Sequence, residues 1–121
     1  MTEVKTGKCH CGAVEFEVTL DKGLDSVRRC NCSLCRRKGI IMGGVPLSGL
    51  RVTKGEDALT LYQWNTQTAK HYFCSICGIH THHQRRTDPN RFGFNVACLE
   101  GVDPFSLEPV AVVDGASLSV E

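Results

Sequence analysis

Seven of the eight cysteines fall in three short clusters whose spacing is typical of metal ligands. The clusters are Cys9-His10-Cys11, Cys30-Asn31-Cys32-Ser33-Leu34-Cys35 and Cys74-Ser75-Ile76-Cys77, with Cys98 left alone. C-x-C pairs make strained disulfides, and in a reducing compartment clustered cysteines more often hold metal. The pattern therefore predicts zinc binding.

The first and third clusters together predict one closed zinc site. On an extended strand, residues i and i+2 face the same way, so Cys9 and Cys11 can point at a single ion. A bend between Cys74 and Cys77 brings two more sulfurs together, and Gly78 suits the tight turn that this requires. Four thiolates form the tetrahedral set of a structural zinc, whose binding contributes ~10–16 kcal/mol to folding.

The middle cluster offers three ligands, Cys30, Cys32 and Cys35, which predicts a zinc site with one open position. Catalytic zinc sites keep such a position for water or substrate. Zinc held by three thiolates is a modest Lewis acid that binds and activates another thiolate. We therefore expect two zinc ions, one structural and one catalytic and more easily lost, and a small thiol or its adduct as substrate.

The same residues admit other interpretations. The clustered thiols could be redox pairs or buried apolar side chains. The middle cluster could be a second structural zinc site, completed by Cys98, His71 or a histidine of His80-Thr81-His82-His83. Cys98 by itself is more typical of a buried small hydrophobic residue than of a ligand.

Length and composition indicate one globular domain over residues 1–121. The chain is 41% hydrophobic and 22% charged, which is ordinary for such a domain. Its formal charge of +1 argues against a large basic surface for nucleic acid. No apolar run approaches the ~20 residues that cross a bilayer, and residues 1–5 lack a signal-peptide pattern, so we expect a cytoplasmic protein. Nothing in the sequence indicates its oligomeric state.

Short alternating and apolar segments predict a mainly β fold of short antiparallel strands. Residues 13–20 alternate between apolar and polar side chains and predict a half-buried strand. Further strands are expected at residues 26–29, 40–45, 50–53, 59–64, 79–84 and 91–97, with one edge strand in the tail from Asp103. No segment shows helical periodicity over 11 residues.

Several other residues carry expectations. On a regular strand His80 and His82 share one face and His83 lies on the other. We expect these histidines to be partly exposed, with the alternative that some line the open zinc site. Tyr62 and Trp64 are expected in the core.

The three clusters, taken with their neighbours, resemble the glutathione-dependent formaldehyde-activating enzyme family. The order and approximate spacing agree from about Lys8 to Gly101. The matching segments are Cys9-His10-Cys11-Gly12-Ala13-Val14, Cys30-Asn31-Cys32-Ser33-Leu34-Cys35 and Phe73-Cys74-Ser75-Ile76-Cys77-Gly78. The segments Arg86-Thr87-Asp88-Pro89-Asn90 and Asn95-Val96-Ala97-Cys98-Leu99 look like the branch that contains the centromere protein V-type domain.

This resemblance implies an Mss4-like zinc-bound β-sheet fold and a carbon–sulfur lyase. The implied reaction forms S-hydroxymethylglutathione from formaldehyde and glutathione, or reverses that step. The implied structural zinc ligands are Cys9, Cys11, Cys74 and Cys77, and the implied catalytic zinc ligands are Cys30, Cys32 and Cys35.

Two alternatives to a lyase stay open. One is a non-catalytic zinc module that binds a protein or a nucleic acid, and the other is zinc or redox buffering through the open cluster. Glutathione carries two carboxylates, so the basic runs Arg36-Arg37-Lys38 and Arg85-Arg86 could either bind a carboxylate or remain solvated loops.

Overall fold

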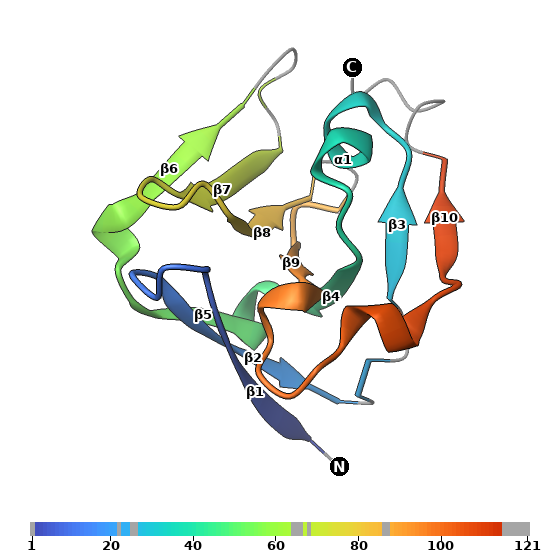
Figure 1. Ribbon diagram of the computed structural model, residues 1–121, viewed down its shortest axis with the longest axis horizontal. Coiled ribbons are helices and arrows are strands. Elements are labelled where there is room, and N and C mark those ends of the chain that lie inside the picture. The colour runs from blue at the N-terminus through green and yellow to red at the C-terminus, as the bar shows by residue number, and fades with distance from the viewer. Residues whose placement is uncertain are drawn as a thin grey trace.

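The computed structural model describes residues 2–21, 23–24, 27–63, 67, 69–85 and 88–114. Within these ranges the fold is mainly β, as predicted (Figure 1). The strands are β1 Glu3–Lys8, β2 Glu15–Leu20, β3 Arg28–Cys30, β4 Met42–Pro46, β5 Leu50–Lys54, β6 Leu59–Tyr62, β7 Lys70–Cys74, β8 His80–Gln84, β9 Arg91–Asn95 and β10 Ala111–Val113. The helices are α1 Ser33–Lys38 and the 3₁₀ segments η1 Leu47–Gly49, η2 Glu56–Ala58, η3 Val96–Cys98 and η4 Pro104–Leu107. Among the residues that the structure describes, no helix is long and apolar enough to cross a membrane.

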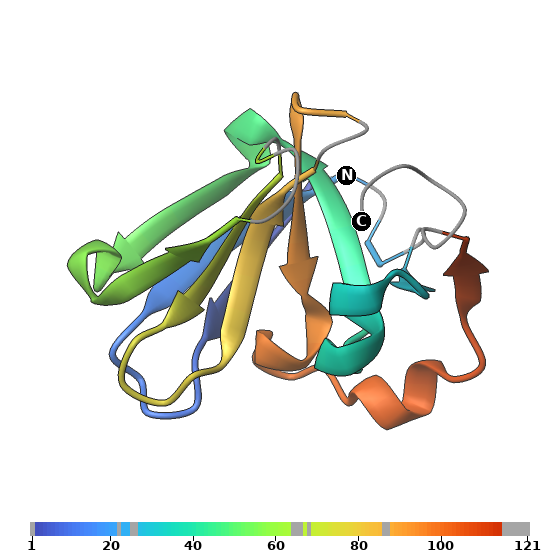
Figure 2. The ribbon, with the colours of Figure 1, turned by 90° about the horizontal axis from the view of Figure 1, so that it is seen from above.

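The strands form two sheets. One has the order β1-β2-β5, and the other has the order β10-β3-β4-β9-β8-β7-β6. Neighbouring strands pair antiparallel except β10, which pairs parallel to β3. In Figure 1, β3, β10 and α1 lie on the opposite side of the molecule from β6 and β7. Figure 2 shows β10, the expected strand of the tail, at the outer edge beyond α1.

The main core contains side chains of both sheets. Phe16, Val18 and Leu20 of β2 are buried, and they belong to one cluster with Val45 of β4 and Phe94 of β9. The intervening side chains of β2 are half-buried or exposed. The alternation predicted for this strand is therefore confirmed, and it holds the small sheet against the large one.

The sequence patterns did not predict β1. Its one large apolar side chain, Val4, is exposed, so no hydrophobic alternation marks it. The strand is held by backbone pairing with β2 over its whole length. At Gly7 a Cβ atom would stand 2.5 Å from the ring of Phe16, so the glycine lets the core ring lie over the strand.

A β-bulge in β8 overturns the expected facing of its histidines. Tyr72 of β7 pairs with His82, and the next residue, Phe73, pairs with His80, so Thr81 is an extra residue. The extra residue places His80 and His83 together, with 3.2 Å between His80 Nε2 and His83 Nδ1. All three histidines are buried, so the expectation of partly exposed side chains was also wrong.

Gly55, between β5 and η2, lies against the backbone that precedes β2. Its φ is +76°, and a Cβ atom there would overlap the carbonyl of Ala13. We predict that Gly55→Ala lowers the free energy of unfolding by more than ~3 kcal/mol, because it adds a backbone clash to the ~1–2 kcal/mol of left-handed strain. Urea denaturation measures this difference.

Gly101 provides the matched control for this substitution. Its φ is +77°, and a Cβ atom there would meet nothing within 4 Å. Gly101→Ala should therefore cost only the strain of ~1–2 kcal/mol. Equal losses in the two variants would contradict the assignment of the larger effect to the Ala13 contact.

His82 predicts a pH-dependent stability. The His82 ring stacks on Tyr72 with 4.8 Å between the ring centroids and meets the ring of Phe92 edge-on, and its Nδ1 is hydrogen-bonded with Thr81 Oγ1. Burial lowers the pKa of His82 to about 4. The unfolded chain therefore binds a proton near pH 6.5 that the folded chain does not. The contribution of His82 is complete above pH 6.5 and is lost as the pH falls toward 4.

We expect His82→Gln to make the fall in unfolding free energy between pH 6.5 and 4 shallower by up to ~1.4 kcal/mol per pH unit. Urea denaturation at fixed pH values measures this slope. An unchanged slope in the His82 variant would show that its imidazole is protonated equally in both states.

Candidate metal centres

Two groups of cysteine sulfurs come together in the described part of the chain. Within each group the sulfur atoms all lie within 4.8 Å of one another, and none is in a disulfide. We call them the four-sulfur site, made of Cys9, Cys11, Cys74 and Cys77, and the three-sulfur site, made of Cys30, Cys32 and Cys35. These are the two sets that the spacing of the clusters predicted.

The four-sulfur site joins the turns of two hairpins. Cys9 and Cys11 lie between β1 and β2, and Cys74 and Cys77 lie where β7 turns into β8. The first pair was expected on an extended strand, but it lies in a turn instead. The turn is closed by Gly12, whose N–H donates to the Cys9 carbonyl at 3.2 Å and whose φ is +82°.

Backbone N–H groups point at the sulfurs of this site. Val14 N–H donates to Cys9 Sγ at 3.3 Å, and Ile76 N–H donates to Cys74 Sγ at 3.4 Å. Gly78, at φ +79°, closes the second turn by donating to the Cys74 carbonyl at 2.8 Å, as its position suggested. Such N–H groups stabilise the thiolate form of a cysteine.

The donor set of the four-sulfur site fits a tetrahedral zinc ion. Cys11 Sγ lies 3.6 Å from Cys9 Sγ and 3.7 Å from Cys74 Sγ. A zinc–sulfur bond of ~2.3 Å gives a tetrahedral edge of about 3.8 Å. Desolvation opposes ionisation of Cys77, but the backbone N–H groups of Cys11 and Ile79 outweigh it and lower its pKa to about 6.

The three-sulfur site is built where β3 passes into α1. Cys30 ends β3, Cys32 caps the N-terminus of α1, and Cys35 lies in its first turn. Cys35 N–H donates to Cys32 Sγ at 3.4 Å, so the helical turn itself brings these two sulfurs together. The helix ends at Gly39, which has φ +66°. Six residues are too few for helical periodicity, and for that reason α1 was not expected.

The three-sulfur site calls for a cation. Cys32 and Cys35 are buried in a small cluster with Met42. Burial raises the pKa of both Cys30 and Cys35, so these thiols do not ionise readily without a positive charge beside them. A metal ion held by these cysteines would supply that charge, and a tetrahedral ion with three sulfur ligands would keep one open position.

No fourth side chain completes this set among the described residues. None of their Cys, His, Asp or Glu ligand atoms lies within 4.8 Å of all three sulfurs. Cys98, one of the alternatives, is buried and donates to the His80 carbonyl at 3.7 Å. Burial raises the pKa of Cys98 to about 12, as suits the buried apolar thiol that its isolation suggested.

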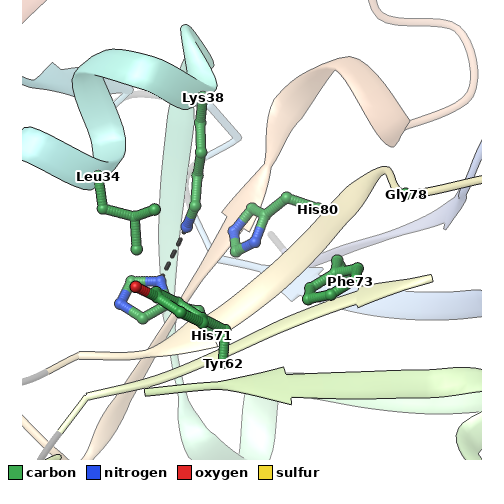
Figure 3. Close-up of a pocket in the computed structure, with 7 residues that line it drawn as sticks. All are labelled: Leu34, Lys38, Tyr62, His71, Phe73, Gly78 and His80. Atoms are coloured by element: carbon green, nitrogen blue, oxygen red, sulfur yellow. Dashed lines mark hydrogen bonds between the residues drawn. The ribbon is translucent and has the colours of Figure 1, made fainter. Parts of the chain in front are cut away.

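A cavity of about 330 Å³ lies between α1 and the strands β6, β7 and β8 (Figure 3). Its wall includes the helix that carries Cys35. The residues that line it are Leu34, Lys38, Tyr62, His71, Phe73, Gly78 and His80. The lining is largely apolar, with nitrogen atoms of one lysine and two histidines among it.

Lys38 connects the cavity with the sulfurs. Its Nζ lies 2.8 Å from His71 Nδ1, and Figure 3 shows the side chain reaching from α1 toward that ring. Burial lowers the pKa of Lys38 to about 8, against the opposing effect of the cysteine thiolates. Burial and the Lys38 charge lower the pKa of His71 to about 3, so its ring is neutral and accepts a hydrogen bond from the ammonium.

Three arginines, Arg28, Arg85 and Arg91, lie near one another, and Arg28 interacts with the thiols of Cys30 and Cys35. Arg28 lies two residues before Cys30 on β3, and a Cβ atom at Gly44 would stand 3.5 Å from a guanidinium nitrogen of both Arg28 and Arg91. Burial and then the charges of Arg85 and Arg91 lower the pKa of Arg28. Like charges this close favour binding of an anion between them.

The structure corrects several expectations about single residues. Tyr62 was expected in the core, but it is 46% exposed and lines the cavity. Lys38 was read as part of a basic run, yet it turns inward while Arg36 and Arg37 are exposed. Trp64 and Arg86 lie outside the described residues.

Comparisons with known proteins agree with this geometry. A sequence model of the family named glutathione-dependent formaldehyde-activating enzyme matches residues 4–113. Two curated proteins that carry this enzyme's name are similar. One, from Penicillium rubens, is 31% identical over 60% of the chain and 40% of its own length; the other, from Halomonas elongata, is 35% identical over 59% and 50%. The chain thus matches about half the length of these relatives or less.

A solved structure covers more of the chain. The crystal structure of a Rhodobacter sphaeroides protein, 56% identical in sequence, superposes on this fold with a TM-score of 0.87. The match covers 89% of this chain and 99% of the solved one. The match of the family model runs through both sulfur sites and nearly the whole of the described fold. The chain therefore belongs to the glutathione-dependent formaldehyde-activating enzyme family.

Proposed function

We propose that this chain is a zinc-dependent carbon–sulfur lyase that acts on the S-hydroxymethyl adduct of a small thiol such as glutathione. The observation that carries the proposal is the three-sulfur site. It offers a metal ion three sulfurs, two of them on buried cysteines, and no fourth ligand among the described residues, and the helix that carries Cys35 lines a cavity. A purely structural site has its ligand set complete.

The two sites are proposed to hold zinc in different roles. The four-sulfur site connects two hairpin turns and has the ligand set of a structural ion. Bound at the three-sulfur site, zinc would supply a positive centre that stabilises the thiolate form of a substrate thiol. Cys30, Cys32 and Cys35 would hold that ion.

The arginine cluster supports a thiol that carries carboxylates. The guanidinium groups of Arg28 and Arg91 both lie close to Gly44, and Arg28 also interacts with the thiol of Cys30. Guanidinium groups bind carboxylates with two parallel hydrogen bonds. A glutathione whose sulfur lies at the three-sulfur site could place a carboxylate among these arginines.

That the chain belongs to the branch of the family with the centromere protein V-type domain stays a prediction.

A first prediction of this proposal separates the two metal sites. Cys32→Ser should lower the zinc content from two ions to one per chain and abolish lyase turnover, while the free energy of unfolding stays near that of the unchanged protein. Cys74→Ser should instead destabilise the fold strongly, because structural zinc contributes ~10–16 kcal/mol to folding. Elemental analysis, urea denaturation and the rate of formaldehyde release measure the three quantities.

Cys98 provides the matched control for these variants, because it is a buried cysteine outside both groups. Cys98→Ser should keep two zinc ions and full turnover. Full turnover in Cys32→Ser would refute the catalytic role of the three-sulfur site. A Cys74→Ser protein as stable as the unchanged one would refute the structural role of the four-sulfur site.

The second prediction tests the carboxylate contact. Arg91→Met should raise KM for the formaldehyde adduct of glutathione by about 10- to 100-fold, since a charge-assisted hydrogen bond contributes ~1.5–3 kcal/mol. KM for the adduct of 2-mercaptoethanol, which has no carboxylate, should not change. Arg51→Met, at an exposed arginine of β5, is the control. An equal rise for both adducts would contradict the assignment.

A further inference from the structure

We propose that Lys38, positioned by His71, is the residue that binds the aldehyde oxygen and gives it a proton as the carbon–sulfur bond forms. This inference rests on the proposed lyase function and deepens it. The three clusters of cysteines do not predict such a group, because they supply only a site for sulfur. An aldehyde adduct also needs a hydrogen-bond donor for its oxygen.

The position of Lys38 is fixed from two directions. It is the last residue of α1, and its half-buried side chain extends into the cavity, where Nζ lies 2.8 Å from Nδ1 of the buried His71 (Figure 3). An ammonium has three donors. One is directed to His71, so the other two remain for further acceptors near the cavity.

The same ammonium lies within the electrostatic reach of the three-sulfur site. Lys38 follows Cys35 by three residues, which places both side chains on one face of the helix. The charge of Lys38 interacts with the thiols of Cys35, Cys32 and Cys30, in that order of strength. A carbon atom attached to a substrate sulfur at this site would thus lie in the field of the Lys38 ammonium.

His71 acts on Lys38 and not on the substrate oxygen. Its ring stacks on the ring of His83, with 5.1 Å between the centroids, and His83 Nδ1 lies within hydrogen-bond distance of His80 Nε2 at 3.2 Å. The imidazole is therefore packed in a fixed orientation. Its neutral Nδ1 can accept the hydrogen bond of an ammonium. His71 is therefore a positioning residue, and Lys38 is the residue that meets the substrate.

The reaction step balances with these groups. In the direction of adduct formation, a lone pair of the substrate thiolate forms the carbon–sulfur bond, and the π electrons of the carbonyl move to its oxygen. That oxygen takes a proton from the Lys38 ammonium and becomes the hydroxyl of the adduct. In the reverse direction the neutral amine takes the hydroxyl proton, the carbonyl re-forms, and the electrons of the breaking bond return to sulfur.

Kinetics of Lys38→Met test this role. Its kcat for formaldehyde release from the glutathione adduct should fall by about 100-fold or more, the range of general acid–base catalysis. Its KM for the adduct should rise by no more than about 10-fold, the factor that the oxygen contact contributes to binding, and its content of two zinc ions should stay unchanged. Lys38→Arg, which keeps the charge, should restore part of kcat. Lys70→Met, at an exposed lysine next to His71 in the chain, should behave as the unchanged protein.

Two further variants and a binding assay separate this role from a structural one. His71→Leu should lower kcat less than Lys38→Met does, with KM unchanged. By calorimetry, the unchanged protein should bind S-acetylglutathione, which carries an oxygen two bonds from sulfur, about 10-fold more tightly than S-ethylglutathione. Lys38→Met should lose this preference, since a charge-assisted hydrogen bond is removed.

Each outcome decides between the inference and the proposed function. If Lys38→Met keeps its kcat, or loses zinc together with kcat, the inference is overturned and the lyase proposal stands. If the unchanged protein releases no formaldehyde but shows the acetyl preference and Lys38→Met loses it, the lyase proposal fails and the oxygen site at Lys38 is supported. If there is neither turnover nor preference, both are overturned.

Discussion

The meeting of four sulfurs across two sheets is the constraint on which the rest of this structure depends. Cys9 and Cys11 belong to a hairpin of the small sheet, and Cys74 and Cys77 belong to a hairpin of the large one. Their turns pack together with Val14 in a small cluster apart from the main core. The four sulfurs therefore link the two sheets at a place outside the core that the sheets share.

The link between the sheets at the four-sulfur site also positions residues that line the cavity. Strand β7 ends at Cys74 and carries His71 three residues earlier. Strand β8 follows the hairpin turn and begins with His80. Both histidines line the cavity that α1 closes from the other side with Lys38. The four-sulfur site and the histidines of the cavity therefore share the strands β7 and β8. A change in the turn between these strands would also move His71 and His80.

The sequence predicted what depends on spacing and local alternation. The two ligand sets came from the distances between cysteines, and β2 came from the alternation around Phe16, because a strand with one buried face must repeat every two residues. Gly78 was identified as a turn residue since a tight bend needs a positive φ. Each cysteine cluster, the strand and the turn are marked by residues within a short segment, so they can be read without the fold. The pairing of the first cluster with the third came from the four ligands that a tetrahedral ion takes.

What could not be predicted depends on pairing across the sheet or on a very short helix. The bulge at Thr81 exists because of the register between β7 and β8, and it reverses the facing of the histidines that follow. Lys38 looks like part of a solvated basic run until α1 turns one of its three members inward. Strand β1 has no apolar pattern, since Gly7 contributes space for Phe16 and no side chain of its own.

The separation of Cys11 and Cys74 by 63 residues has a consequence for how the chain matures on the ribosome. As the polypeptide emerges, its first five clustered cysteines are exposed together long before Cys74 and Cys77 are synthesised. A metal ion that bound early could take sulfurs of the first and second clusters together, and it would have to exchange ligands when the later pair arrives. Such an exchange would add a step to folding beyond the slow search that distant contacts impose.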